Sequence, residues 1–134
     1  MNYWLAKSDP ETYGWTEFVK DKKTSWDGVR NYAARNHLKT MKTGDEILFY
    51  HSGKVSSIVG RATVGKEFYT DPTADDDTWV SVEFLVGKPF KKEISLQMIK
   101  ADARLKNMML VKISRLSVSV VNEQEFNIIL SMDK

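Results

Sequence analysis

The stretch Ser25-Trp26-Asp27-Gly28-Val29-Arg30-Asn31 does most to decide the fold. It places an aromatic ring, a glycine and an asparagine directly before an amphipathic segment that ends near Gly44. Asparagine favours the start of a helix, because its side chain accepts a hydrogen bond from a free N–H group of the first turn. The pattern predicts a helix from Asn31 to just before Gly44, with an apolar stripe at Ala34, Leu38 and Met41.

Strand patterns lie on both sides of this helix. Residues 3–7 form an aromatic-rich strand that stops before Pro10, because proline supplies no backbone donor to a sheet. Residues 79–86 alternate apolar and polar side chains, which is the period of a half-buried strand. Further strands are predicted at residues 46–51, 57–65 and 110–113.

Capping residues predict three more helices. Thr16 precedes a short helix over residues 17–20, and Ser95 precedes a helical turn over residues 96–100. Asn122 and Glu125 have the spacing of a capping box, which predicts a final helix through residues 128–130. Strands in the middle with helices at both ends indicate one α+β domain over residues 1–134, with a small bent sheet or barrel flanked by helices.

The composition excludes several kinds of chemistry. The absence of cysteine excludes disulfides, thiol catalysis and iron–sulfur clusters. The two histidines lie in different predicted elements, and the glycines do not have phosphate-loop spacing. No secretory signal or membrane-spanning run is visible. We therefore expect an intracellular protein, cytoplasmic or, in a eukaryote, nuclear, that needs no metal or cofactor and binds no membrane.

Charge is distributed unevenly along the chain, although the net charge is only +2. Residues 1–44 carry eight Lys/Arg against five Asp/Glu, and residues 86–116 carry eight against two. Residues 67–83 carry six acidic and no basic side chains. A basic side of this kind fits nucleic-acid phosphate, and it also fits an ordinary solvated surface. The residues predicted to contact phosphate are Arg30, Arg35, Lys39, Lys42, Lys91, Lys92, Lys112 and Arg115.

Two of the four tryptophans, Trp26 and Trp79, lie beside polar, turn-forming sequence. A nucleobase site needs aromatic faces for stacking, directed polar groups for the base edge and nearby cations. A tryptophan at such a position is equally a core side chain. His51 and Ser52 are a weak basis for a hydrolase, because neighbouring side chains on a strand point to opposite faces.

Several motifs follow one another in a specific order along nearly the whole chain. They include Lys7-Ser8-Asp9-Pro10, the stretch from Trp26 to Asn31, Phe49-Tyr50-His51-Ser52 and Tyr69-Thr70-Asp71-Pro72. In this order they strongly resemble the EVE domain family, that of thymocyte nuclear protein. The resemblance implies a PUA-like fold, a small β-barrel of about five to six strands flanked by helices, related to the YTH readers of methylated adenine in RNA.

The resemblance also implies a reader without catalytic activity, which flips a modified base into an aromatic pocket. The base would be a modified cytosine in DNA or a modified base in RNA, and any effector activity would belong to a separate protein. By position, Trp26 and Trp79 correspond to aromatic walls. The remaining positions that correspond to the nucleobase pocket are Ser8, Asn31, Tyr50, His51 and Ser52.

Two other functions fit the same residues. A general RNA-binding module of the PUA type would read shape and backbone without selecting a modified base, and it would need the basic side but not Trp26. An enzyme that acts on a nucleotide is the second alternative. Two positions depart from the family pattern: Asp9 stands where glutamate is usual, and His37 occupies the variable position of Arg35-Asn36-His37-Leu38.

Overall fold

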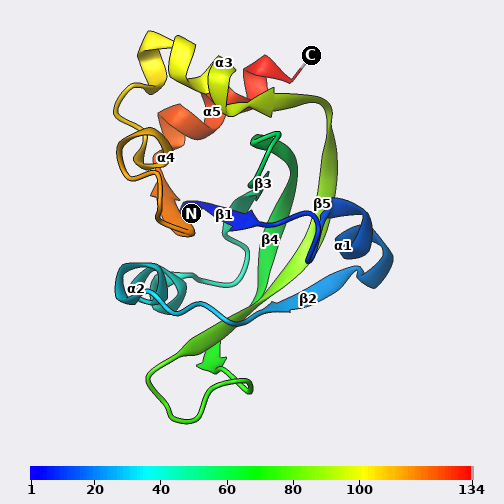
Figure 1. The fold of residues 1–134 in the computed structure, drawn as a ribbon, viewed down its shortest axis with the longest axis vertical. Coiled ribbons are helices and arrows are strands. Elements are labelled where there is room, and N and C mark those ends of the chain that lie inside the picture. Colours follow the sequence, from blue (N-terminus) through cyan, green and yellow to red (C-terminus); the bar gives the residue numbers. More distant parts are fainter. Residues whose placement is uncertain (134) are drawn as a thin grey trace.

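A strongly curved sheet forms the centre of the molecule, and helices lie on both of its faces (Figure 1). The computed structural model describes residues 1–133. One parallel pair, β1 with β3, lies within an otherwise antiparallel sheet. The strands lie in the order β2 (Lys23–Trp26), β5 (Val80–Ser95), β4 (Ser57–Thr70), β3 (Glu46–His51), β1 (Tyr3–Ser8) and β6 (Val118–Val121).

The hairpin of β4 and β5 gives the sheet its curvature. Both strands run most of the length of the molecule, and their pairing is interrupted by four register shifts. An extra residue in one strand bends that strand and increases its twist, so the hairpin curls around the other strands. The sheet stays open between its edge strands, β2 and β6. The predicted α+β fold with five to six strands flanked by helices is therefore confirmed.

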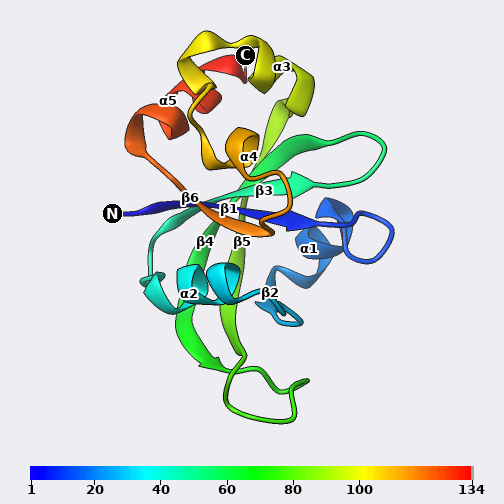
Figure 2. The same cartoon turned by 60° about the vertical axis from the view of Figure 1, so that its left-hand side comes forward.

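Each face of the sheet has its own hydrophobic core. Successive side chains of β1 alternate between the two, because strand residues point to opposite faces in turn: Trp4 and Ala6 belong to one core and Leu5 to the other. The first core lies under α1 (Trp15–Asp21) and α2 (Tyr32–Thr40). The second, at the other end of the molecule, is covered by α3 (Leu96–Ala101), η1 (Ala103–Leu105), α4 (Met109–Lys112) and α5 (Glu123–Met132) (Figure 2).

Three predicted helix starts are confirmed. Asn31 Oδ1 accepts a hydrogen bond from the N–H of Ala34 at 2.9 Å, and the side chain of Ser95 accepts one from Met98. Asn122 and Glu125 form the predicted capping box. The stripe of α2 is buried as expected. None of the helices within residues 1–133 is long and apolar enough to cross a membrane.

One predicted helix cap and one predicted strand are wrong. The first helix is capped at Gly14, not Thr16, because the carboxylate of Glu17 reaches back to accept the N–H of Gly14 at 2.8 Å. Residues 110–113 are not a strand, since α4 covers Met109–Lys112. A run of four residues is too short for its hydrophobic period to distinguish a strand from a helix. In this segment only Leu110 is buried within the helix. The backbone N–H groups of residues 111–113 donate to the carbonyl oxygens of Met108 and Met109, which closes a helical turn.

The two edge strands have weak sequence signals. β2 reads Lys-Thr-Ser-Trp and gains its strand geometry by pairing with β5. β6 pairs antiparallel with β1, opposite Tyr3 to Ala6. Both strands have four residues, so tertiary pairing rather than local pattern sets their conformation.

Gly60 provides a test of how closely the first core is packed. A Cβ at this position would lie 2.6 Å from Cζ2 of Trp15, so the ring would have to move. We expect Gly60→Ala to lower the free energy of unfolding by about 1–3 kcal/mol, measured by urea denaturation. In a Trp15→Leu background, Gly60→Ala should lower the free energy of unfolding by less, because the Trp15 ring that the new Cβ contacts is absent. Equal costs in both backgrounds would contradict this packing.

Candidate functional site

A cavity of about 560 Å³ opens between the end of β1 and the segment that follows β2. This volume is within the range of sites that hold small molecules. The cavity is lined by residues 7–9, 12–13, 24–30 and Ser117, and we call it the Trp26 cavity. It brings together two of the motifs recognised in the sequence, Lys7-Ser8-Asp9-Pro10 and the stretch from Trp26 to Arg30.

Trp26 is both a wall of this cavity and part of the first core. Its ring stacks on Phe84, with the ring centroids 4.7 Å apart and the planes 18° from parallel. Phe49 contacts it in an edge geometry. Only 9% of the residue is exposed, and the exposed part belongs to the cavity wall. The core therefore fixes the plane of the ring before any ligand arrives.

Asp71 holds the loop that follows Trp26. Its Oδ2 accepts the N–H of Gly28 at 2.8 Å and Nη1 of Arg30 at 2.9 Å. Its Oδ1 accepts the backbone N–H and the hydroxyl of Thr73, both at 2.7 Å. Gly28 has a φ of 77°, a conformation that glycine adopts without strain. One carboxylate thus fixes both the backbone at Gly28 and the direction of the Arg30 side chain.

These contacts decide the ionisation of Asp71. Burial alone would raise the pKa of this carboxyl group. The hydrogen bonds from Thr73, Arg30 and Gly28 outweigh burial and hold the pKa of Asp71 far below its ordinary value. Asp71 is therefore ionised at neutral pH, as a buried acceptor of four hydrogen bonds has to be.

The other side of the Trp26 cavity is the end of β1. The hydroxyl of Ser8 donates to the carbonyl oxygen of Tyr13, and the hydroxyl of Tyr13 donates to Asp21. The hydroxyl of Ser8 is therefore already engaged in holding the turn that carries Tyr13. Two acidic residues, Asp9 and Asp27, line the cavity from its two sides.

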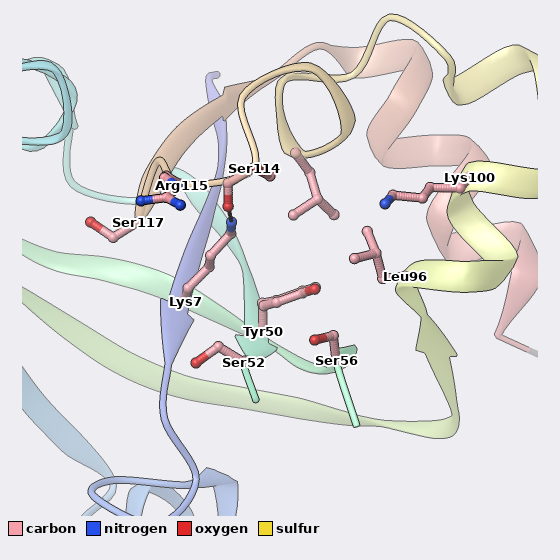
Figure 3. Close-up of a pocket in the computed structure, with 10 residues that line it drawn as sticks. Lys7, Tyr50, Ser52, Ser56, Leu96, Lys100, Ser114, Arg115 and Ser117 are labelled. Carbon is pink, nitrogen blue, oxygen red and sulfur yellow. Dashed lines mark hydrogen bonds between the residues drawn. The ribbon is translucent and has the colours of Figure 1, made fainter. Parts of the chain in front are cut away.

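A second cavity, of about 340 Å³, shares Lys7 and Ser117 with the first. Tyr50 and Ser52, which the sequence assigns to the nucleobase pocket, line this second cavity together with Arg115 (Figure 3). Neither Tyr50 nor Ser52 lines the Trp26 cavity. We call the second one the Tyr50 cavity.

His51 lies on the other side of the strand from Tyr50. Its Nε2 accepts the backbone N–H of Trp15 at 3.0 Å. Burial lowers the pKa of His51, while the charges of Glu93 and Glu17 oppose this effect. The ring is therefore neutral at pH 7, which the bond requires, because a protonated imidazole has no acceptor nitrogen. His51 positions the start of α1 and lines neither of the two cavities.

Trp79 and Asn31 lie outside both cavities. Trp79 packs on Tyr32 with ring centroids 5.0 Å apart, and the guanidinium of Arg30 lies 5.6 Å from its ring centre. It lines a third hollow together with Asp75, Asp76 and Arg30, and Arg30 also lines the Trp26 cavity. Of the predicted nucleobase residues, the structure brings Ser8 and Trp26 together in one cavity and Tyr50 and Ser52 in the next.

The residues predicted to contact phosphate also lie at different places, some in the two cavities and others outside them. Arg30 lines the Trp26 cavity and Arg115 the Tyr50 cavity. Arg35 donates to the carbonyl oxygen of Thr78, and Lys42 lies 3.9 Å from Glu67. Six predicted residues line neither cavity: Arg35, Lys39, Lys42, Lys91, Lys92 and Lys112.

Asn31 acts as a helix cap in this structure, which leads to a prediction. We expect Asn31→Ala to lower the free energy of unfolding by about 1 kcal/mol, because the N–H of Ala34 loses its acceptor. Ligand selectivity should remain unchanged, since Asn31 lies outside both cavities. Urea denaturation and binding assays below the melting transition measure the two effects. A loss of selectivity in the folded variant would place Asn31 in direct contact with the ligand.

The sequence analysis did not assign roles to Lys7 and Asp71. Lys7 lines both cavities, and its signal was its place directly before Ser8 in the first motif. Asp71 appeared as one of six acidic residues between 67 and 83 and within the motif Tyr69-Thr70-Asp71-Pro72, without a role of its own. Its position before Pro72, at the end of a strand, was the only local sign that it differs from the solvated acidic residues around it.

Comparison with known proteins identifies the family. The model of the EVE domain family matches residues 2–132. The chain belongs to the EVE domain family. Mouse thymocyte nuclear protein 1 is 35% identical to this EVE domain, over 99% of this chain and 74% of its own length.

Solved structures agree with this assignment. An Agrobacterium tumefaciens protein superposes on this EVE domain with a TM-score of 0.95 and 37% identity, covering 99% of this chain and 93% of that one. Human THYN1, solved in complex with DNA that contains 5-methylcytosine, gives a TM-score of 0.91 at 32% identity, with 100% and 98% covered. The small barrel-like fold expected from the resemblance is thus the fold of these relatives.

Proposed function

We propose that this EVE domain binds nucleic acid and reads one modified nucleobase, held in the Trp26 cavity. The observation that carries the proposal is the placement of Trp26, whose ring is fixed by Phe84 on the core side and lines a cavity of about 560 Å³. A preorganised aromatic wall stacks on a base without first losing side-chain entropy. Lys7 supplies positive charge at the same cavity, and Arg30, whose guanidinium is paired with Asp71, lines it as well.

The structure of human THYN1 with DNA that contains 5-methylcytosine supports 5-methylcytosine as the first base to test. Cytosine also suits the polar groups of the cavity. Its exocyclic amino group is a donor that carboxylates accept, and Asp9 and Asp27 both line the cavity. Thymine carries the same methyl group but presents a carbonyl oxygen in place of the amino group. The cavity should therefore prefer 5-methylcytosine to thymine.

The energies favour a single strand over a duplex. Burying one methyl group contributes about 0.8 kcal/mol, and stacking contributes about 1–3 kcal/mol for one base. Taking a base out of a duplex costs a few kcal/mol, which consumes most of this gain. A single-stranded, mispaired or damaged base avoids that cost, so we expect tighter binding to single strands.

Three single-stranded oligonucleotides test the proposal, identical except for 5-methylcytosine, cytosine or thymine at one position. We expect cytosine to bind about fourfold more weakly than 5-methylcytosine, as one methyl group predicts. Thymine should bind roughly tenfold more weakly, because a carboxylate then faces a carbonyl oxygen. Asp27→Asn should reduce the preference over thymine, whereas Asp75→Asn, outside the cavity, should preserve it.

Two results would redirect the proposal to its alternatives. Equal affinity for the three strands would favour a general nucleic-acid-binding module that reads shape and backbone. Conversion of a modified nucleoside to another product, detected by mass spectrometry after incubation with the protein, would favour an enzyme. A reader returns every nucleoside unchanged.

A further inference from the structure

We infer that the Tyr50 cavity is the binding site for a backbone phosphate next to the base held in the Trp26 cavity. This inference rests on the proposed function, because it places a strand across two neighbouring cavities. The ligand it assigns to the second cavity is an anionic phosphodiester rather than a second base. Tyr50 and Ser52 would then contribute to binding the backbone.

The cavity is built from parts of the chain that are far apart in sequence. Lys7 comes from the end of β1, Tyr50 from the end of β3, Lys100 from α3 and Arg115 from the loop after α4. Figure 3 shows Lys100 and Arg115 on opposite sides, with Tyr50 between them and Lys7 reaching across to Ser114. Three cations from three separate elements thus border one hollow of about 340 Å³.

These cations have no acidic counterpart. No carboxylate lines the cavity, and none within residues 1–133 lies within ion-pair distance of Lys7, Lys100 or Arg115. Lys7 is half-buried, and burial weakens the solvation of its charge, whereas Lys100 and Arg115 are exposed. An anion bound beside Lys7 offsets that loss of solvation, and the two exposed cations add to the attraction. A phosphate oxygen is also the acceptor that lysine and arginine bind most often in nucleic-acid complexes.

Lys7 is held in place but not neutralised. Its Nζ donates to the carbonyl oxygen of Ser114 at 2.6 Å and lies 5.6 Å from the centre of the Tyr50 ring. An ammonium group has three donors, so two remain for a ligand. Burial lowers the pKa of Lys7, and a bound anion would raise it again. Ser52 and Ser117 also line the cavity.

The position of the cavity suits a phosphate better than a separate small anion. Lys7 and Ser117 line both cavities, so the two hollows share a wall. A nucleotide with its base in the Trp26 cavity carries phosphates on either side of its sugar, and one of them has to leave the base cavity close to this wall. The cations therefore lie where the backbone of a flipped nucleotide emerges.

Neutral backbone linkages test this placement. The probe is a single-stranded oligonucleotide with one 5-methylcytosine, in which the phosphate on either its 5′ or its 3′ side is replaced by an uncharged methylphosphonate. We expect one of the two replacements to lower the affinity of the unaltered protein roughly tenfold, since a charge-assisted hydrogen bond to phosphate is lost. In the variant Lys100→Gln/Arg115→Gln the same replacement should have no effect, because the partner groups are already gone.

A charge-matched control separates this site from general attraction. Lys20→Gln/Lys106→Gln removes the same charge from exposed positions outside both cavities and should keep the tenfold effect. An undiminished effect in Lys100→Gln/Arg115→Gln would overturn the inference. A second result would also overturn the inference. If neither methylphosphonate replacement changed the affinity of the unaltered protein, but inorganic phosphate alone shifted the amide resonances of Lys100 and Arg115, the cavity would hold a free anion.

The two proposals fail in different ways. Loss of the methylphosphonate effect with a retained preference for 5-methylcytosine over cytosine would reject the phosphate site and keep the base reader. Equal affinity for 5-methylcytosine and cytosine strands, with a methylphosphonate effect that still depends on Lys100 and Arg115, would reject the base reader and keep the phosphate site.

Discussion

Trp26→Ala is expected to lower the free energy of unfolding by about 3–5 kcal/mol and to weaken binding of the 5-methylcytosine strand at least tenfold. The stability loss follows from the stack of Trp26 on Phe84, because the change leaves a cavity in the first core. The binding loss follows from the cavity wall, because one stacked base contributes about 1–3 kcal/mol. Urea denaturation and fluorescence anisotropy with a labelled strand measure the two effects.

Two further variants separate these roles. Phe84→Leu removes the other half of the stack from a position that lines neither cavity, so it should reduce stability and weaken binding only slightly, through a less fixed Trp26 ring. Trp26→Phe keeps a ring above Phe84 and should remain folded while it weakens binding by a smaller factor. If Phe84→Leu weakened binding as much as Trp26→Phe, the ring of Trp26 would be a core side chain only.

Asp71→Asn is expected to lower the free energy of unfolding by roughly 3 kcal/mol. Each carboxylate oxygen accepts two donors, so whichever way the amide turns, two donors lose an acceptor and face an N–H group. A buried donor without a partner costs about 1–3 kcal/mol. Asp75→Asn, in the same acidic loop but exposed, is the matched control and should leave stability unchanged. A similar loss in both variants would mean that the loop, not the buried carboxylate, is responsible.

The same carboxylate gives a specific dependence of stability on pH. The pKa of Asp71 is lower in the folded protein than its ordinary value of 3.8, so the unfolded chain binds a proton first as the pH falls. The stabilisation is therefore complete above about pH 4 and is lost as the pH falls further, towards the folded pKa, by up to about 1.4 kcal/mol per pH unit. Urea denaturation between about pH 2 and pH 6 should show this slope, and Asp71→Asn should lack that part of it.

Local sequence predicts the secondary structure correctly where a single side chain determines where a helix begins. Asn31 and Ser95 start their helices as expected, because a side-chain cap involves only neighbouring residues. The sequence did not reveal that Trp26 belongs both to the core and to the cavity wall. Its core contact is with Phe84, which lies on another strand. The roles of Lys7 and Asp71 could not be predicted for the same reason. Their hydrogen-bond partners lie 107 and about 40 residues away in the sequence.

Tyr50 and His51, which the resemblance assigns to one pocket together with Ser52, lie on opposite sides of β3 in the structure. Side chains of consecutive strand residues point to opposite faces. Tyr50 accordingly reaches the second core and the Tyr50 cavity, while His51 points to the other side and holds Trp15. Motifs that are continuous in sequence can therefore supply two different sites, and the alternation of the strand already predicts this separation.

The pairing of β6 with β1 brings Val121 opposite Tyr3, so the last strand of the described chain lies beside the first one. Ser117, just before β6, lines both cavities. Neither cavity is complete until this late strand has docked on the first one. During synthesis on a ribosome, a growing chain would thus acquire its binding site only after residues 117–121 have been made. Such long-range pairing also slows folding, because the loop must close before its contacts form. Immature chains would remain unable to engage nucleic acid until the fold is finished.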